Sequence, residues 1–146
     1  MVDANLAVSD DCTTVFQNVK MNPGNDEEKQ KQKLRYATYK IEDRKTVVVD
    51  QTGPMNATYA DLLGAIPQDE PRFVVIDYPY QTNDNRDTSK ILFIFWSPDS
   101  TSVQNKMIYA STKDNVKRRF EGIFKEIQAC GPSDLEEADI RRGLPN

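Results

Sequence analysis

The chain has 146 residues, with 19 basic and 23 acidic side chains and a net charge of −4. A chain of this length suits one domain and buries enough apolar surface to fold without disulfides or metals. The negative charge argues against bulk attraction to nucleic acid or an anionic membrane, and the absence of histidine removes Ser-His-Asp and Cys-His catalysis and imidazole metal sites.

The N-terminal third predicts a helix, a polar loop and two strands. Ser9 can cap the helix, and the polar stretch 22–33 is typical of a solvated loop. Apolar runs at 34–41 and 46–51 predict two strands joined as a hairpin. The apolar positions of the helix follow its 3.6-residue period and are Cys12, Val15, Phe16 and Val19.

The middle of the chain predicts a short helix and two buried strands. Thr58 and Asp61 form a capping-box pattern at the start of the helix. The runs 72–78 and 90–96 are almost continuously apolar, which favours strands buried on both faces. The polar stretch 79–89 between them is expected to be an exposed loop.

A long helix is predicted over 103–120, with Thr101 and Gln104 as its capping box. Advancing 100° per residue separates two faces. The core stripe consists of Ile108, Tyr109, Val116, Phe120 and Ile123, and the opposite face carries Val103, Met107 and Ala110 beside Lys106, Lys113 and Lys117. Two hypotheses explain an apolar side chain on that face: a kink near Ser111 turns Met107 into the core, or Met107 inserts into a groove on a partner protein.

The C-terminal part predicts a last strand within 122–129 and a short helix capped by Ser133 and Glu136. Cys12 and Cys130 are expected to be reduced packing residues. Together the elements predict one α/β domain over residues 1–146, with a central mixed β-sheet flanked by helices on both faces.

Targeting, membrane and catalytic motifs give no positive prediction. The first residues lack the basic start and apolar run of a signal peptide, and no run approaches the roughly 18 apolar residues of a membrane span. The six glycines form no phosphate-binding motif, and the clustered carboxylates lie in polar stretches. We therefore expect no enzyme, no cofactor, no metal site and no integral membrane protein.

Two motifs resemble the actin-depolymerising-factor/cofilin family: "FWSPD" at 95–99 and "KMIYASTKD" at 106–114. Weaker matches are "AVSDDCTTVF", "NATYADLLGAIP", "RFVVIDYPYQ" and "EIQA". The resemblance implies an ADF-homology domain that binds actin monomers and filament sides and promotes filament severing and depolymerisation. It also implies a non-enzymatic monomer in the cytoplasm on the actin cytoskeleton, with the nucleus as a second compartment.

The resemblance also implies two binding faces, with Met107 as the apolar anchor of the first. The face for monomers and filaments would comprise Ala4, Asn5, Leu6, Val103, Lys106, Met107, Ala110, Lys113, Asp114, Lys117 and Arg118. The filament-only face would comprise Arg86, Asp87, Lys90, Arg141 and Arg142.

Some positions depart from the family pattern. Gln104, Asp87 and Thr88 stand where basic residues are usual, and Ala4 stands where the family has a regulatory serine. These departures favour monomer binding over strong severing and leave two alternatives open. One is a coactosin-like filament binder without strong severing. The other is a phosphoinositide-binding module that would use Lys106, Lys113, Lys117 and Arg118.

Overall fold

One mixed sheet of six strands runs through the protein, and the computed structural model describes residues 6–146 of the chain. The strand order is β1-β3-β2-β4-β5-β6; the two outer pairs, β1 with β3 and β5 with β6, are parallel, and the inner pairs are antiparallel. The strands are β1 (Ala7–Val8), β2 (Leu34–Glu42), β3 (Thr46–Pro54), β4 (Arg72–Gln81), β5 (Asp87–Trp96) and β6 (Lys125–Ala129).

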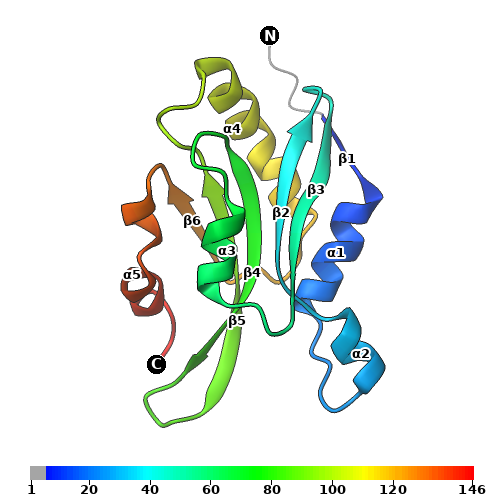
Figure 1. The fold of residues 1–146 in the computed structure, drawn as a ribbon, viewed down its shortest axis with the longest axis vertical. Helices are drawn as coiled ribbons and strands as arrows, with labels where there is room; N and C mark the ends of the chain where they lie inside the picture. The colour runs from blue at the N-terminus through cyan, green and yellow to red at the C-terminus, as the bar shows by residue number, and fades with distance from the viewer. Residues whose placement is uncertain (1–5) are drawn as a thin grey trace.

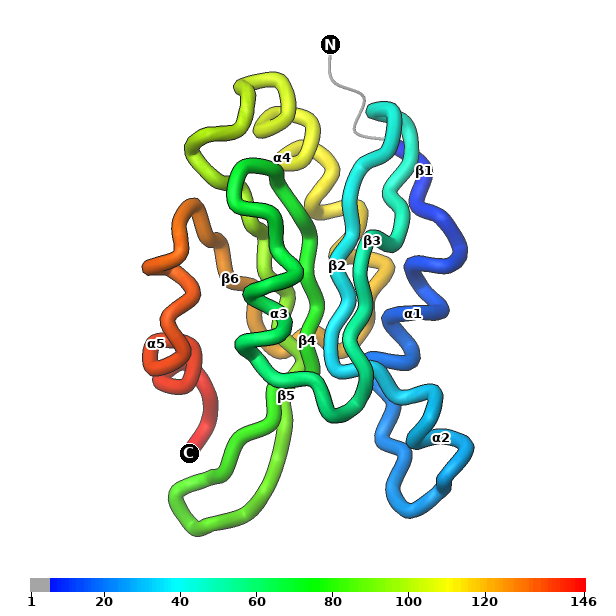
Figure 2. Tube along the Cα trace, in the orientation of Figure 1, coloured from blue at the N-terminus to red at the C-terminus, as the bar shows by residue number. Residues whose placement is uncertain are grey.

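Helices cover both faces of this sheet, as Figures 1 and 2 show. They are α1 (Asp10–Lys20), α2 (Glu27–Gln32), α3 (Tyr59–Ala65), α4 (Val103–Arg118), the 3₁₀ helix η1 (Pro132–Leu135) and α5 (Glu137–Arg142). α1 and α4 pack on one face, and α3, η1 and α5 pack on the other. The predicted fold class, a mixed sheet flanked by helices on both faces, is therefore confirmed.

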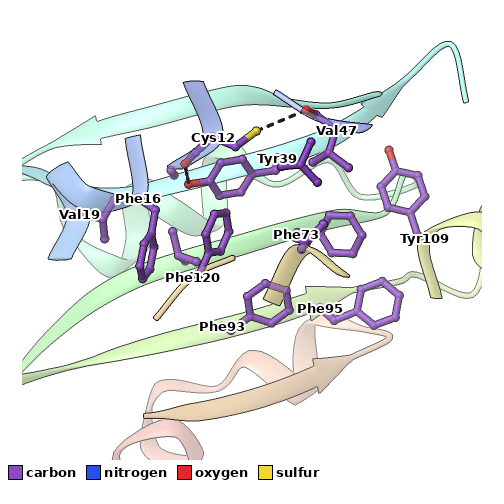
Figure 3. Packing of buried hydrophobic residues seen from close by; sticks show 14 residues of the cluster. Cys12, Phe16, Val19, Tyr39, Val47, Phe73, Phe93, Phe95, Tyr109 and Phe120 are labelled. Atoms are coloured by element: carbon purple, nitrogen blue, oxygen red, sulfur yellow. Dashed lines mark hydrogen bonds between the residues drawn. The ribbon is translucent and has the colours of Figure 1, made fainter. Parts of the chain in front are cut away.

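Aromatic side chains dominate the core under α1 and α4 (Figure 3). The rings of Phe16 and Phe120 stack with their centroids 4.6 Å apart, and Phe120 lies 5.1 Å from Tyr39. Tyr109 of α4 packs against Phe73 of β4 at 5.3 Å. Burial of large side chains contributes roughly 1.5–3 kcal/mol each, so this layer fixes which side of α4 faces inward.

The core stripe predicted for α4 is largely confirmed. Tyr109, Val116 and Phe120 are buried, and Ile108 and Ile123 are partly buried against the same cluster. The second core, on the opposite face of the sheet, contains alternate residues of β4 and β5 with Leu62, Leu135 and Ile140 from the helices. The alternation follows from the two-residue period of a strand, which sends neighbours to opposite faces.

The longest ladder joins β4 and β5, which pair at ten positions from Arg72 opposite Trp96 to Gln81 opposite Asp87. The two strands project beyond the rest of the sheet as a hairpin (Figure 1). The prediction of an exposed loop over 79–89 is wrong for most of that stretch, because only 82–86 lie outside the strands. The polar residues at the ends of the two strands pair with each other through backbone hydrogen bonds. Such pairing leaves no apolar period in the sequence.

Two short elements were not predicted. α2 lies in the stretch predicted as a loop, and none of its residues is buried. Its start is fixed by Asp26, whose carboxylate accepts hydrogen bonds from the amides of Glu28 and Lys29. β1 is a two-residue strand that pairs with β3.

Two predicted caps and one packing residue are wrong. α4 is capped by Ser102, whose hydroxyl accepts from the Asn105 amide at 3.1 Å, and Thr101 is buried one residue before the cap. The terminal segment divides into η1 and α5, and α5 begins at Glu137, after the N-cap residue Glu136, which forms no side-chain cap hydrogen bond. Cys130 is exposed, whereas Cys12 is buried. The capping box of Thr58 and Asp61 is confirmed.

Among residues 6–146, no helix combines the length and the apolar character that crossing a bilayer requires.

Candidate functional site

The outer face of α4 presents a row of apolar side chains to solvent. Val103 is 70% exposed and Met107 is 53% exposed, and Ala110, one turn further on, is also exposed. α4 is one continuous helix from Val103 to Arg118, so Met107 is not rotated inward at Ser111. The hypothesis that Met107 belongs to the core is therefore wrong.

Charged side chains border this row, but two of them are held by the fold. The Lys113 ammonium lies 2.9 Å from one oxygen of Glu126 on β6, and that of Lys117 lies 3.0 Å from the other. The Lys113 side chain is only 17% exposed, and its charge also lies 5.9 Å from the centre of the Phe95 ring. Lys113 therefore anchors α4 to the sheet, while Lys117 remains more accessible.

Glu126 has a perturbed acidity because of this arrangement. Partial burial by itself would raise the pKa of its carboxyl group. The hydrogen bonds and charges of Lys113 and Lys117 outweigh that effect and hold the pKa below its usual value. The carboxylate therefore stays ionised at neutral pH and offsets one of the two lysine charges on this side of α4.

The remaining charged residues of the predicted face lie on the exposed side of α4. Asp114 and Arg118 are exposed, Lys106 is partly exposed, and the Arg118 Nε donates to the Asp114 carbonyl at 3.3 Å. Leu6 is buried, and its carbonyl accepts a hydrogen bond from the Asn115 side chain of α4 at 3.2 Å. The structure thus brings Leu6 to α4, while Ala4 and Asn5 lie outside the described residues.

The residues predicted for a filament-only face gather around the β4–β5 hairpin and α5. The Arg141 guanidinium lies 4.6 Å from the centre of the Tyr80 ring and donates to the Gln81 carbonyl at 3.0 Å. Arg142 pairs with Asp139 within α5. A cation over an aromatic ring is stabilised by the ring quadrupole, so Arg141 fastens α5 to the hairpin.

The other three members lie along the hairpin itself. Arg86 pairs with Asp84 at 3.0 Å, and the Asp87 carboxylate accepts from the side-chain amide of Gln81 at 3.5 Å. The Lys90 ammonium lies 5.2 Å from the centre of the half-exposed Phe124 ring. In Figure 1, the start of α4 lies at the top of the molecule and the tip of the hairpin at the bottom, so the apolar row and the hairpin tip lie at opposite ends.

Three residues that the sequence did not single out contribute to these faces. Glu126 holds two lysines of α4, Tyr80 supports Arg141, and Arg44 donates to the Gln104 side chain at 3.1 Å. Arg44 and Gln104 are 60 positions apart in sequence. Sequence periodicity carries no signal for such a contact, because it depends on how the sheet brings a turn beside a helix.

Comparison with known proteins decides the family. The model of a family described as cofilin/tropomyosin-type actin-binding protein matches residues 5–144. The chain belongs to the cofilin and actin-depolymerising factor family. Among its relatives in this family is actin-depolymerizing factor 6 of Oryza sativa subsp. japonica, 41% identical over 131 residues, which are 89% of this chain and 88% of the relative. Actin-depolymerizing factor 10 of Arabidopsis thaliana is 40% identical over 142 residues, 97% of this chain and 94% of the relative.

Solved structures agree with this assignment. Cofilin of Streptomyces griseoflavus superposes with a TM-score of 0.81 at 27% identity, covering 94% of this chain and 98% of that one. Actin depolymerization factor 2 of Plasmodium berghei gives 0.80 at 29% identity and covers 97% of both chains. Coactosin of Entamoeba histolytica gives 0.77 at only 17% identity, covering 96% of this chain and 94% of that one, and so shows a shared fold alone.

Proposed function

We propose that this chain is a non-enzymatic actin-binding protein that binds actin monomers and filament sides and promotes filament severing and depolymerisation. One observation carries the proposal: Val103, Met107 and Ala110 form an exposed apolar row on α4. An apolar helix row bordered by charges is the arrangement with which a helix fills a groove on a partner. Membership of the cofilin family points to actin as that partner.

The charges around the row suit an acidic partner. Lys106, Lys117 and Arg118 border it, and Asp114 is the exposed acidic residue among them. Exposed positive charges raise the rate of encounter with an acidic surface and contribute less to the lifetime of the complex. In this proposal the apolar row therefore supplies affinity and the cations supply association rate.

Filament binding would use the hairpin and α5 as a second contact. Arg141 is held over Tyr80, and Lys90 lies over Phe124, so two cations have defined positions there. Asp87 places a negative charge on the same hairpin. The second contact is therefore proposed to be weaker than the first.

The test is a pelleting assay with actin filaments over a range of protein concentrations. We expect the protein to co-sediment with filaments and, at higher ratios, to move actin from the pellet to the supernatant. Counting filament ends by microscopy separates severing from loss of subunits at existing ends. No binding to filaments or to labelled monomers would overturn the proposal.

The two alternatives predict different results in related assays. A coactosin-like filament binder would co-sediment without lowering pelletable actin, and the relatives at about 40% identity do not favour it. A phosphoinositide-binding module would pellet with phosphoinositide vesicles to the same extent with and without actin monomers. Two of its four cations share Glu126, which reduces the charge available to a headgroup.

Actin as the partner implies a place for the protein. We propose that it lies in the cytoplasm on the actin cytoskeleton and acts as a monomer. Fluorescent tagging with and without filament-dissolving drugs tests the location, and sedimentation equilibrium tests the oligomeric state.

A further inference from the structure

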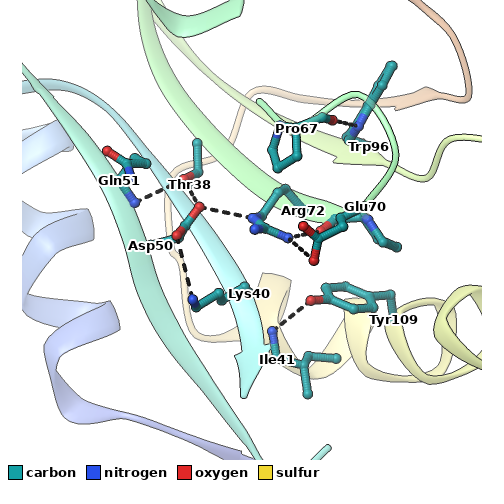
Figure 4. A network of polar contacts seen from close by, with 11 residues as sticks. Thr38, Lys40, Ile41, Asp50, Gln51, Pro67, Glu70, Arg72, Trp96 and Tyr109 are labelled. Carbon is teal, nitrogen blue, oxygen red and sulfur yellow. Dashed lines mark hydrogen bonds and ion pairs between the residues drawn. The ribbon is translucent and has the colours of Figure 1, made fainter. Parts of the chain in front are cut away.

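The turn between β2 and β3 packs beside the exposed face of α4. The Ile41 amide at the end of β2 donates to the Tyr109 hydroxyl at 2.9 Å, a contact visible in Figure 4. Tyr109 is buried on α4, so this hydrogen bond connects the turn to a fixed point of the helix. The position of the turn relative to α4 is thus defined by the core and not by surface contacts.

The backbone of the turn fixes the direction of its central side chain. Asp43 and Arg44 have φ angles of 53° and 57°, in the left-handed region. Two consecutive residues in this region, closed by the hydrogen bond from the Lys45 amide to the Glu42 carbonyl at 3.0 Å, form the usual tight turn of a β-hairpin. The Arg44 side chain extends from the turn to α4, where its Nη2 lies 3.1 Å from the Gln104 side-chain oxygen.

The Arg44–Gln104 contact contributes little to folding. It joins an exposed arginine to a neutral amide, and such a bond exchanges with water at small net gain. The first turn of α4 is also the positive end of the helix dipole, where a cation is not favoured. Within residues 6–146, the Arg44 guanidinium forms no ion pair, and the nearest acidic residues in sequence are the exposed Glu42 and Asp43.

The contact places a cation beside the apolar row. On the helix, Gln104 lies about 60° from Met107, on the side away from Lys106 and Lys117. Arg44 therefore borders the row on the flank opposite the lysines. The segment that enters at Leu6 reaches the same corner, because the Ala7 amide donates to the Lys45 carbonyl at 3.2 Å.

From these contacts we infer that the β2–β3 turn is part of the actin-docking surface and that Arg44 is a binding residue of it. This inference rests on the proposed function, because the partner is the same actin groove. The turn supplies from a different strand the positive charge that Gln104 does not carry. A partner that covers Met107 would then contact α4 and the turn together.

The experiment measures binding to fluorescently labelled actin monomers at several salt concentrations. Arg44→Ala is expected to weaken binding about two- to fivefold, the size of one exposed charge contact, and to lower its salt dependence. Lys29→Ala is the matched control, because Lys29 is an exposed cation on α2, outside both proposed faces. It is expected to change binding less than twofold.

A second variant tests whether binding needs a positive charge at this position or needs Arg44 itself. Gln104→Arg in the Arg44→Ala protein restores a cation at the same place and should recover most of the lost affinity. Thermal unfolding of each variant shows whether the turn has only a structural role.

Three results would overturn the inference. They are unchanged binding by Arg44→Ala, equal losses for Arg44→Ala and Lys29→Ala, and a lower melting temperature with normal binding of the folded protein. Met107→Ala in the same assay separates a failure of the role of Arg44 from a failure of the proposed function. If the parent protein binds and Met107→Ala weakens it while Arg44→Ala does not, only the role of Arg44 fails; if the parent does not bind, the proposed function fails.

Discussion

Met107 exposes 53% of its surface on a helix whose opposite side is buried, so truncating it removes little from the core. Met107→Ala is expected to leave the melting temperature almost unchanged and to weaken actin binding about 4- to 15-fold. A partner can bury only the exposed half of the side chain, which contributes about half of the roughly 1.5–3 kcal/mol for burying a whole methionine side chain. Equilibrium titration of labelled actin monomers measures the loss.

Leu63→Ala is the matched control for this prediction. Leu63 is also a half-exposed apolar residue, but it lies on α3, on the other face of the sheet. Its truncation should leave actin binding unchanged. Equal losses for the two variants would contradict the assignment of the apolar row as the docking site.

The free energy of unfolding should depend on whether Glu126 is ionised. Its folded-state pKa lies below its ordinary value of 4.5, so the ionised carboxylate stabilises the protein above that pH. This stabilisation is lost as the pH falls through the depressed pKa. Glu126→Gln should therefore lower the free energy of unfolding by up to about 1 kcal/mol at pH 7 and by much less near pH 3.

Urea unfolding at the two pH values measures this difference. Glu121→Gln is a suitable control, because Glu121 is exposed and forms no ion pair within residues 6–146. A loss of equal size at both pH values would show that Glu126 acts through packing and not through its charge.

At the scale of an element, the β4–β5 hairpin sets the strength of the proposed filament contact. Asp87 is exposed there, opposite Gln81 at the end of the ladder. Asp87→Lys removes a repulsion from an acidic partner and adds an attraction, which should strengthen filament binding several-fold, or about 1 kcal/mol. Thr88→Arg should add to the gain, and monomer affinity should stay nearly constant.

Filament co-sedimentation beside monomer titration tests the hairpin. Glu27→Lys makes the same charge change on α2, an exposed helix outside both proposed faces, and should have little effect. Equal gains in affinity for monomers and filaments, or equal gains for Asp87→Lys and Glu27→Lys, would contradict a filament contact at the hairpin. They would show that only the net charge of the protein matters.

The elements that the sequence predicts well are those with a buried stripe. The apolar period identified α1 and the inward face of α4, and the continuous apolar runs identified β4 and β5. α2 escaped because a helix with no buried residue has no hydrophobic period, and only its cap at Asp26 marks it. The sequence does not show whether Ser102 or Thr101 caps α4, because both are hydroxyl residues and they are adjacent. Only the fold shows that Thr101 is buried and that Ser102 is the N-cap.

The candidate faces were predictable only in part for the same reason. Met107 stood out because it breaks the pattern of its own helix. The roles of Glu126, Arg44 and Tyr80 depend on contacts between elements far apart in sequence, and a single sequence encodes such contacts without displaying them.

For the whole molecule, the two proposed faces should act independently. The start of α4 and the hairpin tip lie at opposite ends of the molecule, and substitutions at separated sites usually add to within about 0.3–0.5 kcal/mol. Filament affinities of the parent, Met107→Ala, Asp87→Lys and the double variant form a cycle that measures the coupling. A coupling above about 1 kcal/mol would mean that the faces communicate through the fold.

The ten-position pairing of β4 and β5 has a mechanical consequence. At about 3.3 Å per residue, the ladder runs for roughly 30 Å from beneath α4 towards the hairpin tip. Further strands pair with its inner half alone, β2 at Phe73–Ile76 and β6 at Leu92–Trp96. The outer half is a two-stranded ribbon, so the ladder is stiffer beside α4 than at the hairpin tip. If the start of α4 and the hairpin tip were held by two different partner molecules, the hairpin tip would therefore bend before the inner ladder does.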